Sequence, residues 1–443
     1  MESNMQIDGF YYDPIKKRHF RILNNNKFHP LINTQVKSEV KPSGPMKNFC
    51  SELSRLHINR SSFNVQECLL SARFAQMECT KINTLEVNDF RGNPMKNINC
   101  DYLIGEPEND SLYGVWSSPE GTGSIIQRLK VSNNSERSDR QFDWRSRSMI
   151  NSFPSGSKVE DLCMVQITGS PCSAVMCLTN HCKKDLTTYS SLGIYYLSND
   201  TQIENHLQTE DCSLNYEFWE PAYSCCPHTL QTLAIGGNKH IRLFTPLYIN
   251  TNRTSNDHTL LEVKGKATSL KFSQDGKRLY AGTNNGYLVS FDVTNKKRIE
   301  TCNLKTKTIA YLHPLKNGNQ LIVSCHDSKL LLMDNRNSRS PIITYSDHVN
   351  DCKKIPVSVD ESVDVLCSSG QDYKIRLWSL KSGKLLHEIP PPENQFSNPM
   401  VDDPTMLYSW YSQSWKSLKG EPRPMIFTCM KDKISIYRHK DDS

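Results

Sequence analysis

A regular strand pattern of small and apolar residues runs through the second half of the chain. Five segments each pair a run of small residues with an alternating apolar run across a tight polar turn, which is typical of β-hairpins; they are residues 233–244, 279–291, 321–333, 365–378 and 425–437. Their ends lie 47, 42, 45 and 59 residues apart. The first three spacings bracket the period of roughly 40–45 residues that is typical of a repeated four-stranded unit. A loop at 390–404 explains the longer fourth spacing.

The first half follows the same pattern less regularly. Apolar runs in residues 111–131, 158–198 and 216–237 can supply three more units, and the polar stretch 131–141 separates two of them. Together with the units that end at Phe291, Met333, Trp378 and Tyr437, this predicts seven. The predicted fold is therefore all-β, a seven-bladed β-propeller over residues 97–443, because ring closure leaves only short, protected edges.

Residues 1–96 lack the repeat and are predicted to form an N-terminal extension. The apolar residues 10–12, a turn at Asp13-Pro14 and a basic stretch into Phe20 predict a short hairpin. Residues 36–45 are predicted to be a linker. Between residues 45 and 77, apolar residues recur at steps of three and four, which favours a pair of amphipathic helices.

The apolar faces of these helices need a partner. They can pack on the propeller rim or insert into a groove of another protein, because several large side chains are too many to leave in water: Leu53, Leu56, Leu69, Leu70 and Phe74. We expect the second alternative, in which residues 97–443 fold without the helices but bind a partner poorly.

The strand ending at Trp378 carries a recognisable motif. The sequence GQDYKIRLW resembles the strand ending of the WD-repeat family, and FSQDGKRLYAG at 272–282 is a second match. The resemblance implies that four residues form the family's structural hydrogen-bond tetrad: His348, Ser368 (or Ser369), Asp372 and Trp378. A buried Asp–His pair needs hydrogen-bond partners, which a hydroxyl and an indole N–H can supply. We therefore interpret these residues as structural rather than catalytic.

Further segments resemble a narrower group. GFYYDPIKKRHFRI with NNNKFHPL, HVNDCKKIPVSV at 348–359, and GQDYKIRLWSL with LLHEIPPP resemble the DDB-type cullin-4-associated factors in the group of WD-repeat protein twenty-one. These stretches cover about a fifth of the chain in the expected order. The resemblance implies a substrate receptor, with one propeller surface on a cullin-4-type adaptor protein and another on a substrate protein.

Members of that group often end a blade with a WD-x-R box, whose arginine reaches the adaptor. Residues 333–336 read Met-Asp-Asn-Arg, so Asp334 and Arg336 match the box while methionine replaces tryptophan. The resemblance implies adaptor binding by Asp334 and Arg336. The alternative is that Asp334 caps the strand turn and Arg336 is a solvated surface residue.

Composition narrows the remaining functions. The formal net charge is +6, with 53 basic and 47 acidic residues, so direct nucleic-acid binding is not expected. The spacing of Cys172, Cys177, His181 and Cys182 fits a metal site poorly. No metal or cofactor is predicted, and most of the 16 cysteines are expected to be reduced.

No catalytic motif accompanies the repeats. The sequence contains no phosphate loop of the GxxxxGK[ST] type and no GxSxG. It also has no apolar leader and no run long enough to span a membrane, so we expect a protein of the nucleus and/or cytoplasm; the basic residues 16–18 fit a solvated turn or a nuclear address. We predict a non-enzymatic scaffold, with a general role in nuclear, RNA or chromatin complexes as the alternative to a ligase receptor.

Overall fold

The computed structural model divides the chain into two compact units, Met1–Ser62 and Phe63–Ser443. It describes residues 10–13, 18–21, 62–84, 95, 98–106, 111–117, 124–130, 147–153, 157–166, 173–182, 188–196, 206–207, 220–224, 232–244, 258–336, 340–390, 407–416 and 422–439. In the first unit, β1 (Phe10–Asp13) and β2 (Arg18–Arg21) pair antiparallel, with Phe10 opposite Arg21. The predicted hairpin is therefore present, whereas the predicted linker lies outside the described residues.

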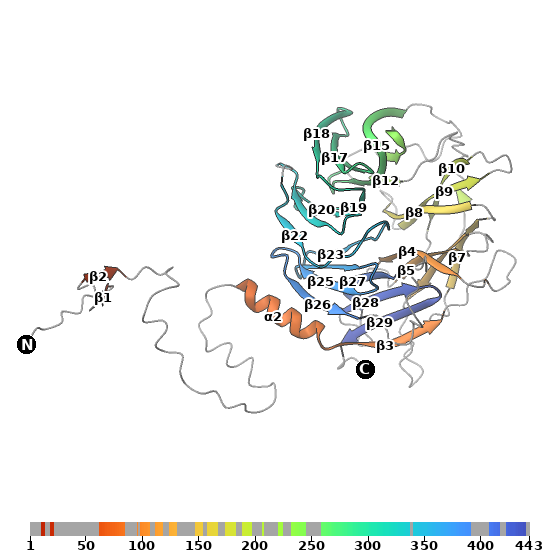
Figure 1. Cartoon of the computed structure of the whole chain (residues 1–443). Helices are drawn as coiled ribbons and strands as arrows, with labels where there is room; N and C mark the ends of the chain where they lie inside the picture. Colours follow the sequence, from red (N-terminus) through yellow and green to blue (C-terminus); the bar gives the residue numbers. More distant parts are fainter. Residues whose placement is uncertain are drawn as a thin grey trace, which may run out of the picture. The chain divides into compact units, whose positions relative to one another are not determined.

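The second unit is built from antiparallel sheets, which Figure 1 shows following one another around a ring. Five of the sheets in the described part of this unit have four strands each. They are β4 (Asn99–Glu106), β5 (Ser111–Ser117), β6 (Ser124–Lys130) and β7 (Arg147–Phe153); β8 (Ser157–Gln166), β9 (Ser173–Cys182), β10 (Thr188–Tyr196) and β11 (His206–Leu207); β19 (Ile309–Pro314), β20 (Gln320–Cys325), β21 (Leu330–Asp334) and β22 (Ile343–Tyr345); β23 (Ser358–Asp360), β24 (Val365–Ser369), β25 (Ile375–Ser379) and β26 (Leu385–Ile389); and β27 (Tyr408–Lys416), β28 (Pro422–Met430) and β29 (Lys433–His439) with β3 (Met77–Thr84).

The sixth sheet is continuous over seven strands. It contains β12 (Glu220–Ser224), β13 (Thr232–Gly236), β14 (Asn238–Phe244), β15 (His258–Phe272), β16 (Arg278–Thr283), β17 (Tyr287–Asp292) and β18 (Lys297–Asn303). The 15-residue β15 joins its two halves, because residues before Gly265 pair mostly with β14 and residues from Ala267 pair with β16. Gly265 lies between them with φ +99°, a backbone angle that favours glycine.

This arrangement confirms an all-β propeller and corrects the predicted blade count. Within the described residues, five four-stranded sheets stand alone as blades, not seven. The remaining blade strands are merged, because no break separates the outer strand of one hairpin set from the inner strand of the next. Sequence spacing can count hairpins, but it cannot show whether a strand continues into the next sheet.

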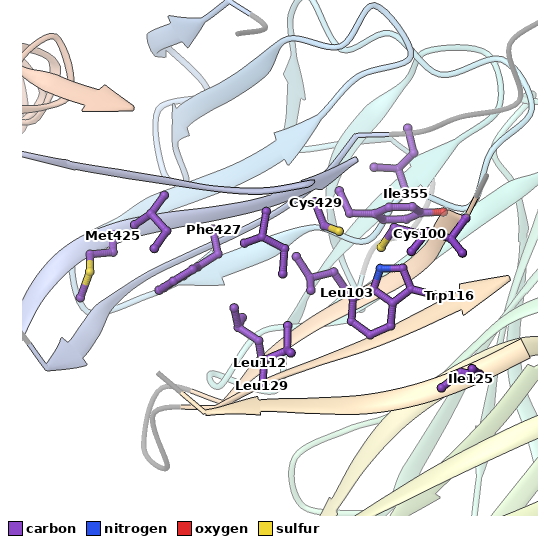
Figure 2. Packing of buried hydrophobic residues seen from close by; sticks show 14 residues of the cluster. Cys100, Leu103, Leu112, Trp116, Ile125, Leu129, Ile355, Met425, Phe427 and Cys429 are labelled. Atoms are coloured by element: carbon purple, nitrogen blue, oxygen red, sulfur yellow. The ribbon is translucent and has the colours of Figure 1, made fainter. Parts of the chain in front are cut away.

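The ring is closed by a strand from the N-terminal side. The strand β3 pairs antiparallel with β29, so that Met77 lies opposite His439 and Thr84 opposite Lys433. An apolar cluster seals this closure between the first and last sheets: Figure 2 shows Leu103 and Trp116 of β4 and β5 near Phe427 and Cys429 of β28. Trp116 and Phe427 are fully buried. The propeller core therefore extends across the junction between the first and last sheets of the ring.

The helix α2 (Ser62–Phe74) belongs to the same unit as the propeller. Leu70 and Phe74 are buried in a cluster with Leu386 of β26 and Tyr411 of β27, and the Phe74 and Tyr411 rings meet edge to face at 5.8 Å between centroids. The Ser71 hydroxyl donates to the Leu386 carbonyl at 2.6 Å. These contacts fix the helix against the β23–β26 sheet and the last sheet.

The predicted extension over residues 1–96 is therefore wrong in part, because α2 and β3 are built into the propeller unit. One of the two predicted helices is present as α2, while Leu53 and Leu56 lie outside the described residues. The expectation that residues 97–443 fold alone conflicts with this pairing, because a cut at residue 97 removes the strand β3 from the last sheet. Among the described helices, none is both long and apolar enough to cross a membrane.

Candidate functional site

Trp378 forms the centre of the predicted tetrad and is fully buried in β25. Its ring meets those of Tyr345 and His348 edge to face, at centroid distances of 6.2 and 6.3 Å. The indole Nε1 donates to the Ser346 carbonyl at 2.9 Å rather than to a serine hydroxyl. Trp378 is therefore packed in the core, and its hydrogen-bond partner is a backbone carbonyl and not the predicted serine hydroxyl.

Asp372 does not bind His348. Its carboxylate accepts from the guanidinium of Arg376, at 3.0 Å from Nη1 to Oδ1 and with a second bond from Nη2 to Oδ2. Arg376 also donates from Nε to Glu388 at 2.9 Å. The side chain of Arg376 is only 5% exposed, so two carboxylates neutralise a buried cation in this blade.

The other two predicted tetrad members bind elsewhere. His348 Nε2 lies 3.4 Å from the Ser324 hydroxyl of the neighbouring sheet, and its Nδ1 has no hydrogen-bond partner among the described residues. The Ser368 hydroxyl donates to the Ser369 carbonyl at 3.1 Å. The predicted hydrogen-bond chain through His348, Ser368, Asp372 and Trp378 is thus absent from the described contacts, although His348 and Trp378 do pack together.

Burial explains the charge state of His348. Desolvation lowers the pKa of His348 to about 4, and the nearby positive charge of Arg376 acts in the same direction. The imidazole is therefore neutral at physiological pH and acts as a packed core group. This environment agrees with a structural role for this part of the propeller.

Asp334 and Arg336 form the second predicted site and lie together where β21 ends. The Asp334 carboxylate accepts from Arg336 Nε at 3.0 Å and from Nη2 at 2.8 Å, a bidentate geometry. It also accepts from the Arg336 backbone N–H at 2.8 Å, which closes the turn. The Arg336 side chain remains 69% exposed, against 20% for Asp334. Asp334 therefore caps the turn and at the same time holds Arg336 at the surface.

The two predicted roles of Asp334 are thus compatible. Hydrogen bonds from the Arg336 side chain and backbone lower the pKa of Asp334 to about 2. The carboxylate is ionised throughout the physiological pH range, so the pair stays intact. An exposed, oriented guanidinium can bind a carboxylate of a partner with its remaining N–H groups.

Asn335 anchors this turn to the turn before β20 in its own sheet and to strand β16 in the adjacent sheet. Its backbone N–H donates to the Asn319 carbonyl at 2.7 Å. Its side-chain Nδ2 lies 2.7 Å from the hydroxyl of Tyr280, a buried residue of β16 in the adjacent sheet. The backbone that presents Arg336 is therefore fixed to the sheets on both sides of the junction. The one sequence signal for this contact is the amide side chain of Asn335 at the third position of the box.

Metal-binding chemistry has no site in the part of the chain that the structure describes. No group of three or more histidine, cysteine or carboxylate side chains gathers there to hold an ion. By their spacing, four cysteine and histidine residues are a poor candidate for a metal site. Of these, Cys177, His181 and Cys182 lie on β9, and Cys172 lies outside the described residues. Burial raises the pKa of Cys325 and Cys367 to about 12, which keeps these thiols protonated.

Comparisons with known proteins agree on one group. The family model described as "DDB1- and CUL4-associated factor 4 beta-propeller domain" matches residues 73–410. The chain is 20% identical over 424 residues to DDB1- and CUL4-associated factor 4 of Homo sapiens, covering 91% of this chain and 82% of the human protein. It is 23% identical over 404 residues to WD repeat-containing protein 21 of Schizosaccharomyces pombe, covering 84% and 87%. The family match begins within α2 and includes both Arg336 and Trp378.

Proposed function

Because the chain belongs to the family of the DDB1- and CUL4-associated factor 4 β-propeller, we propose that it is a substrate receptor of a cullin-RING ubiquitin ligase. In this role it binds a DDB1-type adaptor through one face and a substrate protein through another, and it performs no chemistry of its own. The family membership agrees with the resemblance that the sequence motifs indicated. The site of action is the nucleus and/or the cytoplasm.

The Asp334–Arg336 turn is the single observation that carries the proposal to specific residues. A guanidinium that is exposed, oriented by a bidentate carboxylate and fixed through Asn335 loses little side-chain freedom when it binds. Surface arginines of this kind are enriched where proteins recognise carboxylates. In our proposal Arg336 contacts an acidic group of the adaptor, and Asp334 positions it.

We extend the proposal to the ring itself, in which the seven-stranded sheet acts as two blades. The register supports this division, because β15 changes partner from β14 to β16 around Gly265. Counted in this way, the described residues of the second unit contain seven inner strands, namely β4, β8, β12, β15, β19, β23 and β27. Within these sheets the Asp334–Arg336 turn lies at the end opposite the turn that holds Asp372, since consecutive hairpin turns alternate between ends.

Affinity purification of the full chain, with quantitative mass spectrometry, tests the proposal. The expected result is recovery of DDB1 and CUL4 in amounts comparable to the bait. Recovery of ribosomal or chromatin subunits without DDB1 would contradict the receptor role and indicate a general scaffold. Purified DDB1 mixed with the purified chain then shows whether the contact is direct.

A further inference from the structure

A basic surface lies beside the Asp334–Arg336 turn, on the β15–β18 half of the seven-stranded sheet. Lys296, Lys297 and Arg298 stand at the start of the outer strand β18, and all three are exposed. The register places Lys297 opposite Asp292, and Asp292 opposite Arg278, across three adjacent strands. The Val293 N–H donates to the Lys277 carbonyl at 2.9 Å, which brings a fifth cation to the same end of the sheet.

A chain of contacts links this surface to Arg336 through Tyr280, which is itself buried. Tyr280 lies two residues after Arg278 in β16, and its hydroxyl binds Asn335, which is next to Arg336. Burial raises the pKa of Tyr280, and the nearby positive charge of Arg278 acts in the opposite direction. One path of direct neighbours therefore leads from Lys297 to Arg336 across the junction of two sheets.

The surface has an excess of positive charge. The strands and turns along this path carry six cations and three carboxylates. The cations are Lys277, Arg278, Lys296, Lys297, Arg298 and Arg336, and the carboxylates are Asp275, Asp292 and Asp334. Each carboxylate already accepts local hydrogen bonds, Asp275 from Ser273, Asp292 from Asn295 and Asp334 from Arg336. No ion pair in the described structure involves Lys296, Lys297 or Arg298, so their charges are available to a partner.

A second physical reason for these charges has to be considered. An exposed outer strand can pair with a strand of another molecule, and charged side chains prevent this. Either sign of charge serves that purpose, so a structural role requires charge but not positive charge. Docking on an acidic surface requires the positive sign. Charge reversal therefore separates the two explanations.

We propose that Lys296, Lys297 and Arg298 extend the adaptor-binding surface around Arg336 and attract an acidic face of the adaptor before contact. The inference rests on the proposed function. Opposite charges on two approaching surfaces accelerate association, and the effect weakens as salt screens it. Arg336 makes the close contact, whereas the basic surface sets the rate at which the two proteins meet.

The test compares two double charge reversals in the full chain, measured by surface plasmon resonance against purified DDB1 of the same organism. K296E with K297E changes the proposed surface, and K305E with K307E is the matched control. Both pairs are exposed and flank β18, but at opposite ends of this seven-residue strand. The match extends to the backbone, because Lys296 and Lys305 both have positive φ, at 54° and 51°.

We expect K296E with K297E to slow association roughly tenfold at low salt, and less at high salt. The control should change the association rate by less than about twofold, since its charges lie farther from the contact than a Debye length of about 10 Å. Thermal melts of both variants should match the wild type, as edge protection needs only charge.

The outcomes separate this inference from the proposed function. Unchanged association of K296E with K297E at low salt would overturn the inference, while wild-type binding that depends on Arg336 would leave the receptor role standing. Equal slowing by the control would also overturn it, because the effect would then reflect net charge alone. Failure of the wild type to bind DDB1 would reject both.

Discussion

Both the helix α2 and the Asp334–Arg336 turn are predicted from the sequence to contact an adaptor, but the structure places the two differently. Phe74 of α2 is completely buried, and β3 forms the outer strand of the last sheet. Arg336, in contrast, is held at the surface by the Asp334 carboxylate, which also accepts from the Arg336 backbone N–H. One segment completes the fold and the other is presented by it.

The difference shows how the two kinds of residue carry information. An apolar helix face has to be buried somewhere. Burial against the same chain avoids the loss of translational and rotational entropy that binding to a second molecule requires. Hence the propeller itself covers Leu70 and Phe74. A charged side chain gains little from its own protein when exposed, so a geometry that keeps Arg336 oriented is better explained by a partner.

The largest expected effect comes from removing the N-terminal segment. Deletion of residues 1–84 takes away α2 and β3, leaves β29 without its outer neighbour and exposes the cluster that contains Tyr411 and Tyr437. We expect aggregation or loss of the cooperative thermal melt. Deletion of residues 1–61 is the control and should melt like the full chain, because it keeps both elements. Circular dichroism monitors both melts. A cooperative melt of the larger deletion would refute the role of β3 in ring closure.

A single residue of α2 should show a smaller effect of the same kind. Phe74→Ala removes a fully buried ring that contacts Tyr411, and we expect a loss of about 3–5 kcal/mol in the free energy of unfolding. Leu69→Ala, on the same helix but 49% exposed, should cost less than about 0.5 kcal/mol. Urea denaturation of both variants measures this difference. Similar values for the two would mean that α2 does not pack as described.

The two aspartate–arginine pairs offer a comparison within the propeller. Arg376→Ala leaves the carboxylates of Asp372 and Glu388 without their shared cation, and we expect a loss of about 2–3 kcal/mol in unfolding free energy. Arg336→Ala should leave the melting temperature unchanged, since its side chain is exposed. A destabilised Arg336→Ala protein would show that this arginine is structural.

Local patterns in the sequence predicted the hairpins of the second half well. The segments ending at Phe291, Met333 and Trp378 are the antiparallel pairs β16–β17, β20–β21 and β24–β25. Alternation of apolar residues is a local property, so a hairpin can be recognised within a dozen residues. The Asp334–Arg336 turn, in contrast, was located by its resemblance to the WD-x-R box at the end of one of these segments.

Non-local features could not be predicted. The strand β3 has the sequence MECTKINT, in which only Met77 and Ile82 are strongly apolar, and its partner β29 lies about 350 residues away. The predicted hydrogen bonds of the tetrad are not formed, for a different reason. Sequence identifies the residue types but not which cation is nearest, and Arg376, four residues after Asp372, binds the carboxylate in place of His348. The Lys-Lys-Arg run at 296–298 was visible in the sequence, but only the register places it near Arg336.

The affinity of Arg336 variants for purified DDB1 tests the central claim most directly. Isothermal titration calorimetry should show a dissociation constant raised at least roughly tenfold by Arg336→Glu, because a reversed charge meets the acidic group of the adaptor. The dissociation constant of Arg336→Lys should lie between those of Arg336→Glu and the wild type. Lysine keeps the positive charge but lacks the planar guanidinium that can donate two hydrogen bonds to one carboxylate. Both variants should melt at the wild-type temperature. Equal dissociation constants for the wild type and Arg336→Glu would contradict the assignment of the Asp334–Arg336 turn as the adaptor-binding site.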